Sequence, residues 1–255
     1  VAILGDATLR SAAAFRDQLA FTTEGAYRSG PIRAGDMDGD GDLDLVGIAS
    51  LGSITSTVQW FEDTDGTGQV FQAHEIATGI KSPHGALAIH DLDGDGDLDV
   101  LVATIPTTVS AFDGSLIRYE NRIGIDGTFS ASTLLSGLPT VFRVLVADLD
   151  HTAGVDLVLE SNSAAAGTIV ALAQDASVTS CATISLPFWG IGTEIGDITE
   201  DGSVDIVQRA INVTTGEGAG LWMYSIQGGS PPTFTQTLLA PADAVRIPLA
   251  IGDLD

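Results

Sequence analysis

The chain has 255 residues, and 34 acidic residues against ten Lys and Arg give it a formal net charge of −24 at pH 7. This acidic excess argues against a nucleic-acid partner, because binding to phosphates needs a basic surface, and against attraction to an anionic membrane. No apolar stretch approaches the length of a membrane span, so membrane insertion is not expected. A hydrophobic content of 44% with 30 glycines is typical of a packed β protein with many loops.

Residues 1–30 are expected to be a lead-in or the end of a preceding repeat, and residues 31–255 a repeat region. The first motif of that region is Asp-Met-Asp-Gly-Asp-Gly-Asp-Leu-Asp at 36–44 (loop 1), and it returns almost unchanged at 91–99 (loop 2). Five carboxylates at alternate positions repel one another strongly unless a cation lies between them. Ca²⁺, which takes six to eight oxygen ligands, is the natural partner.

Two glycines in each loop allow a tight turn in which the side chains at positions 1, 3, 5 and 9 converge. The predicted side-chain ligands are Asp36, Asp38, Asp40 and Asp44 in loop 1, and Asp91, Asp93, Asp95 and Asp99 in loop 2. At position 7, Asp42 and Asp97 are expected to contribute the backbone carbonyl, as in other Asp-rich calcium loops.

Weaker copies of the motif follow at 148–156 (loop 3) and 197–205 (loop 4), and a fifth opens at 253–255. The candidate ligands are Asp148, Asp150, Thr152 and Asp156 in loop 3, and Asp197, Thr199, Asp201 and Asp205 in loop 4. Each loop has Thr in place of one carboxylate, which predicts weaker metal binding. Successive loops start 55, 57, 49 and 56 residues apart, and the five loops hold 19 of the 34 acidic residues. This period is typical of a repeat architecture.

Short apolar runs flank the loops and predict strands rather than helices. An EF-hand would need helices on both sides and Glu at position 12, where this chain has Gly47 or Val102. Runs such as 86–89 and 144–147 precede loops, and runs such as 98–102 and 155–159 follow them. Because they are rich in Val, Ile and Leu, they predict buried strands joined by each loop.

Two further strands are predicted in each period. One includes residues 58–61, 117–119, 169–172 or 221–224, and the next follows a Gly-rich turn at 65–68 or 126–127. Four short antiparallel strands in about 50 residues form the blade of a β-propeller. The predicted fold is therefore all-β, a propeller of four-stranded antiparallel blades with four full repeats and partial ones.

The chain resembles the FG-GAP/VCBS repeat family, which also forms the propeller of integrin α subunits. The resemblance rests on the loop at 91–99, on Trp-Phe-Glu-Asp-Thr-Asp-Gly-Thr-Gly at 60–68, and on Tyr-Glu-Asn followed by Asp-Gly-Thr-Phe within 119–129. It covers roughly residues 31–255; repeats 1 and 2 match closely, and repeats 3 and 4 depart at loop positions 3–6. The resemblance implies Ca²⁺ in loops on one rim, and service in adhesion, in lectin-like binding or as an appendage of a secreted enzyme.

No catalytic residues are predicted, because the sequence has no Gly-x-Ser-x-Gly elbow, HExxH motif or phosphate loop. Trp60 and Trp222 occupy the same strand of their repeats and are expected in the core, while Trp189 is the best candidate for a recognition residue. Cys181 is expected to be a buried apolar residue. Asn212-Val-Thr is a glycosylation sequon, relevant only in a eukaryotic secreted protein.

The expected function is that of an extracellular or cell-surface, Ca²⁺-stabilised module that binds a protein or glycan surface without turnover. Two alternatives remain: an accessory propeller of a secreted polysaccharide-active enzyme, and a structural subunit of a surface appendage that packs against neighbouring chains. Partner contacts are expected from loops 50–56, 105–110 and 214–218. A closed ring of about seven blades needs roughly 380 residues, so the chain is expected to be part of a longer protein.

Overall fold

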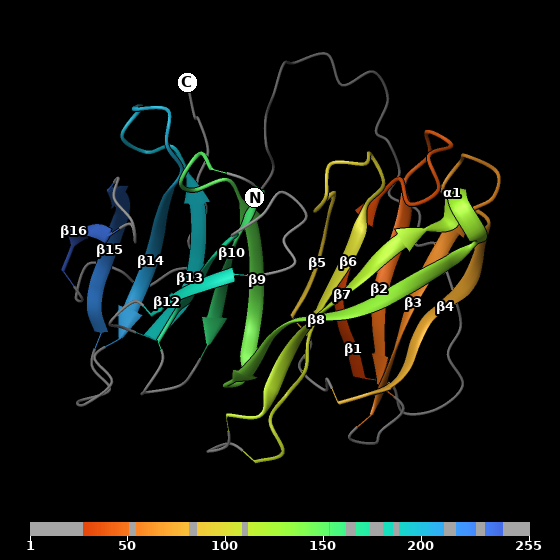
Figure 1. Ribbon diagram of the computed structural model, residues 1–255, viewed down its shortest axis with the longest axis horizontal. Coiled ribbons are helices and arrows are strands. Elements are labelled where there is room, and N and C mark those ends of the chain that lie inside the picture. The colour runs from red at the N-terminus through yellow and green to blue at the C-terminus, as the bar shows by residue number, and fades with distance from the viewer. Residues whose placement is uncertain are drawn as a thin grey trace, which may run out of the picture.

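The computed structural model describes residues 28–50, 55–81, 86–108, 112–152, 154–161, 167–173, 181–185, 189–211, 218–227 and 233–241. In these ranges the chain forms strands and one single-turn helix, arranged in four sheets (Figure 1). Sheet 1 comprises β1 (Arg28–Gly35), β2 (Asp44–Ser50), β3 (Ser56–Asp63) and β4 (Phe71–Ile80). Sheet 2 comprises β5 (Leu87–His90), β6 (Asp99–Ala103), β7 (Gly114–Arg122) and β8 (Thr128–Leu138).

The second half of the chain repeats this arrangement. Sheet 3 comprises β9 (Val141–Ala147), β10 (Asp156–Ser161), β11 (Ile169–Ala173) and β12 (Cys181–Ser185). Sheet 4 comprises β13 (Trp189–Gly196), β14 (Asp205–Ile211), β15 (Gly218–Gln227) and β16 (Thr233–Ala240). Every sheet pairs its strands antiparallel in sequence order, which confirms the prediction of four-stranded antiparallel units.

Burial differs systematically between the strands of a sheet. The second strands β6 and β10 have apolar runs after their first Asp, and all five residues of β6 are buried. In the third strands β3 and β7 buried and half-buried side chains alternate except at one pair of adjacent buried residues, and all five residues of β11 are buried. In the fourth strands β4 and β16 at least half of the residues are exposed. A strand covered on both faces needs a continuous apolar run, whereas a strand at the outside needs few apolar residues.

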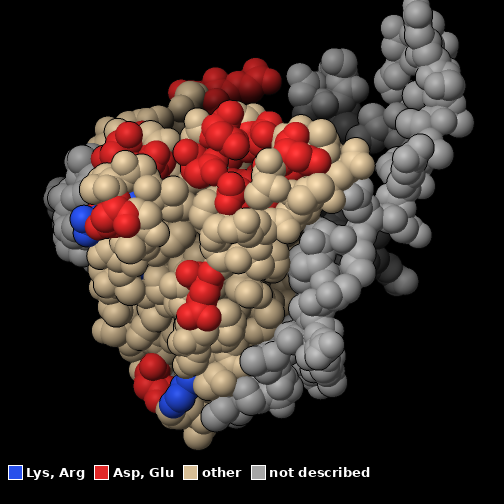
Figure 2. Space-filling model, turned by 90° about the vertical axis from the view of Figure 1, so that its right-hand side faces the viewer, with Lys and Arg blue, Asp and Glu red and all other residues tan. Residues whose placement is uncertain are grey.

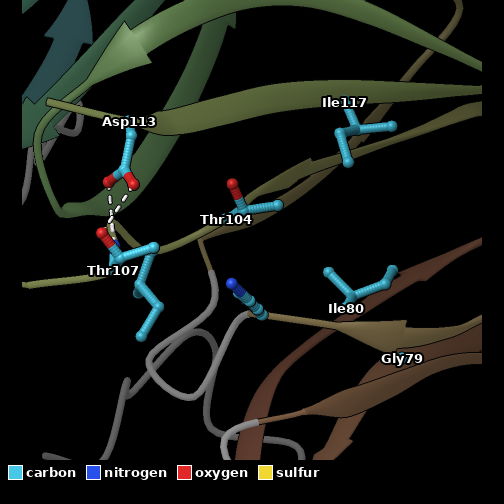
Figure 3. A pocket seen from close by; sticks show the side chains of 8 residues that line it. Gly79, Ile80, Thr104, Thr107, Asp113 and Ile117 are labelled. Atoms are coloured by element: carbon cyan, nitrogen blue, oxygen red, sulfur yellow. Dashed lines mark hydrogen bonds between the residues drawn. The ribbon is translucent and has the colours of Figure 1, made fainter.

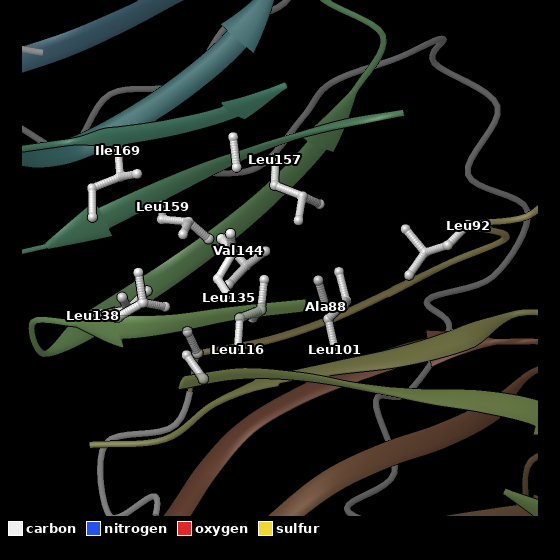
Figure 4. Close-up of a cluster of buried hydrophobic side chains, with 14 of the residues drawn as sticks. Ala88, Leu92, Leu101, Leu116, Leu135, Leu138, Val144, Leu157, Leu159 and Ile169 are labelled. Atoms are coloured by element: carbon white, nitrogen blue, oxygen red, sulfur yellow. The ribbon is translucent and has the colours of Figure 1, made fainter. Parts of the chain in front are cut away.

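The hydrophobic core lies between neighbouring sheets. One cluster joins sheets 1 and 2 through residues such as Val58 and Tyr119, and another joins sheets 3 and 4 through residues such as Leu172 and Tyr224. The cluster between sheets 2 and 3 includes Leu101 of β6, which packs on the same core as residues of β9 and β10 (Figure 4). The first strand of each sheet contacts the first strand of the next sheet: β1 contacts β5, β5 contacts β9, and β9 contacts β13.

The connection between β7 and β8 differs from the hairpin turn expected at Asp126-Gly127. It is a single helical turn, α1 (Ile123–Asp126), which ends at Gly127 in the left-handed conformation with φ of 75°. The Gly127 N–H donates to the carbonyls of Arg122 and Ile123, which satisfies the end of the turn. Among the described residues, no helix has the length and apolarity that crossing a membrane requires.

Candidate metal centres on one edge of the sheets

Loops 1 to 4 lie on the same edge of the four sheets. Each loop joins the first strand of its sheet to the second, as loop 1 joins β1 to β2. The connections between the third and fourth strands, such as residues 64–70, emerge on the same edge because the strands alternate in direction. Acidic side chains gather over this end of the molecule (Figure 2), and we call it the acid edge.

The first Asp of each loop holds the loop backbone in place. In loop 1 the Asp36 carboxylate accepts the N–H of Gly39 at 2.8 Å and that of Gly41 at 3.0 Å. In loop 2 Asp91 accepts the N–H of Gly94 at 2.7 Å and that of Gly96 at 3.0 Å. Asp148 accepts from His151, and Asp197 from Asp201 and Gly202. Four different sequences therefore fold into closely related turns.

The last Asp of each loop is buried and ties the loop to the third strand. The exposed fractions of Asp44, Asp99, Asp156 and Asp205 are only 0–1%. One carboxylate oxygen of Asp44 accepts the N–H of Met37 at 2.9 Å, and the other accepts the N–H of Asp63 at 2.8 Å. Asp99 and Asp156 each accept the same pair of backbone N–H groups. Asp205 accepts one backbone N–H, and its other oxygen accepts the hydroxyl of Ser225 on the third strand. The predicted ligand at position 9 therefore also supports the backbone.

Three loops bring carboxylates close enough to share one cation. The groups are Asp36, Asp38 and Asp44 in loop 1; Asp91, Asp93 and Asp95 in loop 2; and Asp148, Asp150 and Asp156 in loop 3. Within each group, one oxygen from each carboxylate lies within 4.8 Å of the others. Loop 4, whose nine residues are all described, forms no such group. There Thr199 replaces a carboxylate, and its hydroxyl donates to Asp205 at 3.3 Å.

The electrostatics of these loops fit a hard cation. Burial raises the pKa of Asp99 to about 6, and burial also raises the pKa of Asp156. Desolvation, followed by the negative charge of Asp40, raises the pKa of Asp38. The Oδ1 atom of Asp93 is buried and accepts no hydrogen bond from the described residues. Carboxylates held in an environment that opposes their negative charge are suited to bind a divalent cation.

The comparison with known families agrees with this repeated geometry. A family of FG-GAP-like repeats matches residues 36–102 and again residues 91–159. Residues 36–159 belong to the FG-GAP-like repeat family. Each matched span runs from an Asp-rich loop to the second strand of the following sheet, so a sequence repeat is offset from a structural sheet. No curated protein matches the chain.

Asn121 connects the first two FG-GAP-like repeats. This residue is buried, and its amide nitrogen donates to the carbonyl of Met37 in loop 1 at 2.7 Å and to that of Leu98 in loop 2 at 3.2 Å. Its backbone N–H donates to Asp99. In the sequence, Asn121 stands out only as the last residue of the Tyr-Glu-Asn motif. Its equivalent in sheet 1 is Asp63, and this correspondence is the signal that could have identified it.

The acidic residue at position 7 of the first FG-GAP-like repeat lies against the following hairpin. A Cβ atom on Gly66 would collide with Oδ2 of Asp42, so the Asp42 side chain packs over Gly66. Desolvation and the charges of Asp40 and Asp63 raise the pKa of Asp42. This placement leaves the backbone carbonyl of Asp42 as its predicted contribution to a metal.

Two of the three tryptophans pack in or against the hydrophobic core. Trp60 is buried, as predicted, and stacks on His74 with ring centroids 4.4 Å apart. Trp222 is half-buried and packs against the core between sheets 3 and 4. The side chains of Trp189 and Cys181, the sequon at Asn212, residues 1–27 and the fifth loop at 253–255 lie outside what the structure describes.

Proposed function

We propose that the chain is part of a Ca²⁺-stabilised β-propeller that binds a protein or glycan surface outside the cell and does not catalyse a reaction. The observation that carries this proposal is the repetition of one acidic loop at one edge of four similar sheets. In three of these loops the carboxylates lie within reach of a common cation. Membership of the FG-GAP-like repeat family supports the same function.

The arrangement of the sheets supports a propeller. Each sheet runs from first to fourth strand in sequence order, and the first strands lie next to one another. This is the relation that blades have around an axis, with the fourth strands at the outside. In a complete ring of about seven blades, further repeats would supply the remaining blades.

Calcium would occupy the acid edge. In loop 1 it would be held by Asp36, Asp38 and Asp44 with support from Asp40, and it would neutralise the charge that these side chains concentrate. Ca²⁺ suits such loops better than Mg²⁺, because it accepts six to eight oxygens in irregular geometry. Millimolar extracellular calcium is sufficient for loops of modest affinity, which favours a location outside the cell.

The partner surface would lie at the opposite edge. Loops 50–56, 105–110 and 214–218 each join the second strand of a sheet to the third, so the strand ends that carry them face away from the acid edge. A pocket of about 360 Å³ is present there between sheets 1 and 2 (Figure 3). It is lined by Lys81, Ile105, Thr107 and Asp113 among others. This mixture of charge, hydroxyl and apolar surface suits a polar ligand such as a glycan.

A melting experiment tests the calcium part. Ligand binding stabilises the folded state by RT ln(1 + [L]/Kd), about 2.7 kcal/mol per site at a hundredfold excess over Kd. We expect millimolar CaCl₂ to raise the Tm by several degrees over EDTA, and equimolar MgCl₂ to raise it much less. Identical melting curves in CaCl₂ and EDTA would refute the proposal.

A binding experiment tests the partner part. A glycan array and a pull-down from extracellular material, each with CaCl₂ and with EDTA, should give binding that calcium supports. The variant Lys81→Ala should weaken binding at the pocket, whereas Glu75→Ala on the exposed face of β4 should leave it unchanged. Hydrolysis or elimination of a polysaccharide by the chain would overturn the proposal and favour the enzyme alternative.

A further inference from the structure

Loop 2 contains a cation supplied by the protein itself. Arg118 of β7 reaches the loop with its guanidinium group, and its side chain is only 5% exposed. Its Nη2 atom forms ion pairs with Oδ2 of Asp93 and, at 2.8 Å, with Oδ2 of Asp99. These two aspartates occupy positions 3 and 9 of the loop, both of which are predicted metal ligands.

The other three sheets have no arginine at this position. In sheet 2, Arg118 pairs with Leu101, the second residue after the last Asp of the loop. The same position in sheets 1, 3 and 4 pairs with Trp60, Val170 and Met223. All three are apolar and buried. The arginine therefore distinguishes loop 2 and is not a general requirement of the fold.

The composition of the carboxylate groups changes in parallel. In loops 1 and 3 the group contains the carboxylates of positions 1, 3 and 9. In loop 2 position 9 is replaced by position 5, so that Asp95 takes the place of Asp99. Asp99 Oδ2 accepts a backbone N–H, that of Leu92 at 3.2 Å, as Asp44 and Asp156 accept theirs, and it differs from them in its contact with the guanidinium of Arg118.

We propose that Arg118 is a tethered counter-cation of loop 2, which keeps this loop ordered without metal and lowers its affinity for Ca²⁺. The inference rests on the proposed calcium binding and assigns different roles to the two strongest sequence motifs. Loop 1 responds to calcium, and loop 2 is partly neutralised beforehand. A buried guanidinium close to two ligands repels an incoming divalent cation and occupies oxygens that the cation requires.

Loop glycines allow each site to be followed separately. The N–H groups of Gly39 and Gly41 report on loop 1, and those of Gly94 and Gly96 report on loop 2, because each donates to the first Asp of its own loop. Their amide NMR signals are titrated with CaCl₂ in the wild type, in Arg118→Met and in Arg122→Met. Met is the residue that sheet 4 has at the equivalent position. Arg122→Met is the charge-matched control. Arg122 is also on β7 but pairs with Asp126 outside the loops, so its replacement removes one positive charge without removing a contact with loop 2.

In the wild type, loop 1 should saturate at a lower Ca²⁺ concentration than loop 2. Arg118→Met should lower the midpoint at Gly94 and Gly96 by about tenfold and leave Gly39 and Gly41 unchanged. Arg122→Met should leave all four midpoints unchanged. Equal loop 2 midpoints in the two variants, or weaker binding in Arg118→Met, would overturn the inference.

Melting in EDTA tests the counter-cation without metal. Arg118→Met should melt well below Arg122→Met, since it leaves Asp93 and Asp99 without their positive partner. Equal Tm values would overturn the inference even if calcium binds. If no glycine signal of the wild type responds to CaCl₂, the proposed calcium function is refuted. The role of Arg118 as a counter-cation is then tested by the Tm comparison in EDTA alone. Should Arg118→Met be unfolded in EDTA, the titration is run from the Ca²⁺-saturated protein by adding chelator, with Arg118→Gln as a second variant.

Discussion

Individual carboxylates in the loops have different roles, although the sequence pattern presents them alike. The first Asp binds backbone N–H groups of its own loop, and the last Asp is buried and binds the third strand. The carboxylates between them in loop 1 are half-buried or exposed. Alternate spacing predicts that the carboxylates cluster, but it does not show which oxygens already accept hydrogen bonds.

Arg118 and Asn121 belong to the site, although the spacing of residues in the sequence does not predict it. Their contacts with loop 2 span 22 to 25 residues of sequence, and the contact of Asn121 with loop 1 spans 84. The pairing of β6 with β7 brings both side chains to loop 2. Spacing rules detect ligands within one loop and cannot detect a side chain that reaches it across a sheet.

Replacement of Asn121 tests the link between loops 1 and 2. Asn121→Ala removes the donors to the carbonyls of Met37 and Leu98, which leaves buried acceptors without a partner. We expect the free energy of unfolding to fall by about 2 kcal/mol. Urea denaturation in CaCl₂ measures the change. Gln72→Ala, which truncates an exposed amide on β4, is the control and should change stability by under about 0.5 kcal/mol.

At the scale of elements, the strands could be predicted and some connections could not. Buried second strands such as β6 are continuous apolar runs, so the sequence identifies them directly. The α1 turn was missed because Asp-Gly is a signal of both hairpin turns and helix ends in the left-handed conformation. The packing of the β3–β4 hairpin on loop 1 also depends on contacts between segments distant in the sequence.

Two glycines of that hairpin provide a matched test of its contact with loop 1. Gly66 and Gly68 have similar positive φ angles of 63° and 68°, so a side chain is strained at either position. A Cβ on Gly66 would also displace the Asp42 carboxylate, whereas a Cβ on Gly68 would meet nothing within 4 Å. Gly66→Ala should therefore be less stable than Gly68→Ala by about 1 kcal/mol.

Chemical denaturation and amide NMR spectra of both variants check this expectation. Gly66→Ala should shift the signals of Gly39 and Gly41, and Gly68→Ala should leave them in place. Equal stabilities and equal spectra would mean that the hairpin does not support the loop.

At the scale of the whole molecule, the fold class was predictable because the same motif recurs. One loop of nine residues is ambiguous, but regular spacing with similar flanking strands predicts repeated sheets. The sequence could not show how the sheets share their cores. That sharing depends on pairs such as Val58 with Tyr119, which belong to different sheets.

The pH dependence of stability should differ between the calcium-free and calcium-bound protein. Burial raises the pKa of Asp99 to about 6 from the ordinary 3.8, and the pKa values of Asp38, Asp42 and Asp156 are also raised. Between the ordinary and the folded-state pKa values, these four groups bind more protons in the folded than in the unfolded protein. Their contribution to stability therefore increases as the pH falls toward about 4 and is lost as the pH rises through the folded-state values.

In EDTA we expect the Tm to rise as the pH is lowered from about 7 to about 5. In CaCl₂ we expect the opposite trend, because protons compete with calcium for the same oxygens. Melting curves at several pH values in both buffers provide the measurement. A calcium-free protein that loses stability steadily over this range would contradict the assignment of the raised pKa values.

Half of the acidic residues, 17 of 34, lie in loops 1 to 4 on the acid edge. The molecule is therefore an electric dipole as well as a polyanion. It should approach a positively charged surface with the acid edge first and leave the loops of the opposite edge facing the solution. Calcium would weaken this dipole, so the protein should elute from an anion-exchange column at lower salt in CaCl₂ than in EDTA. A protein immobilised through the acid edge would present the proposed partner surface outward in a common orientation.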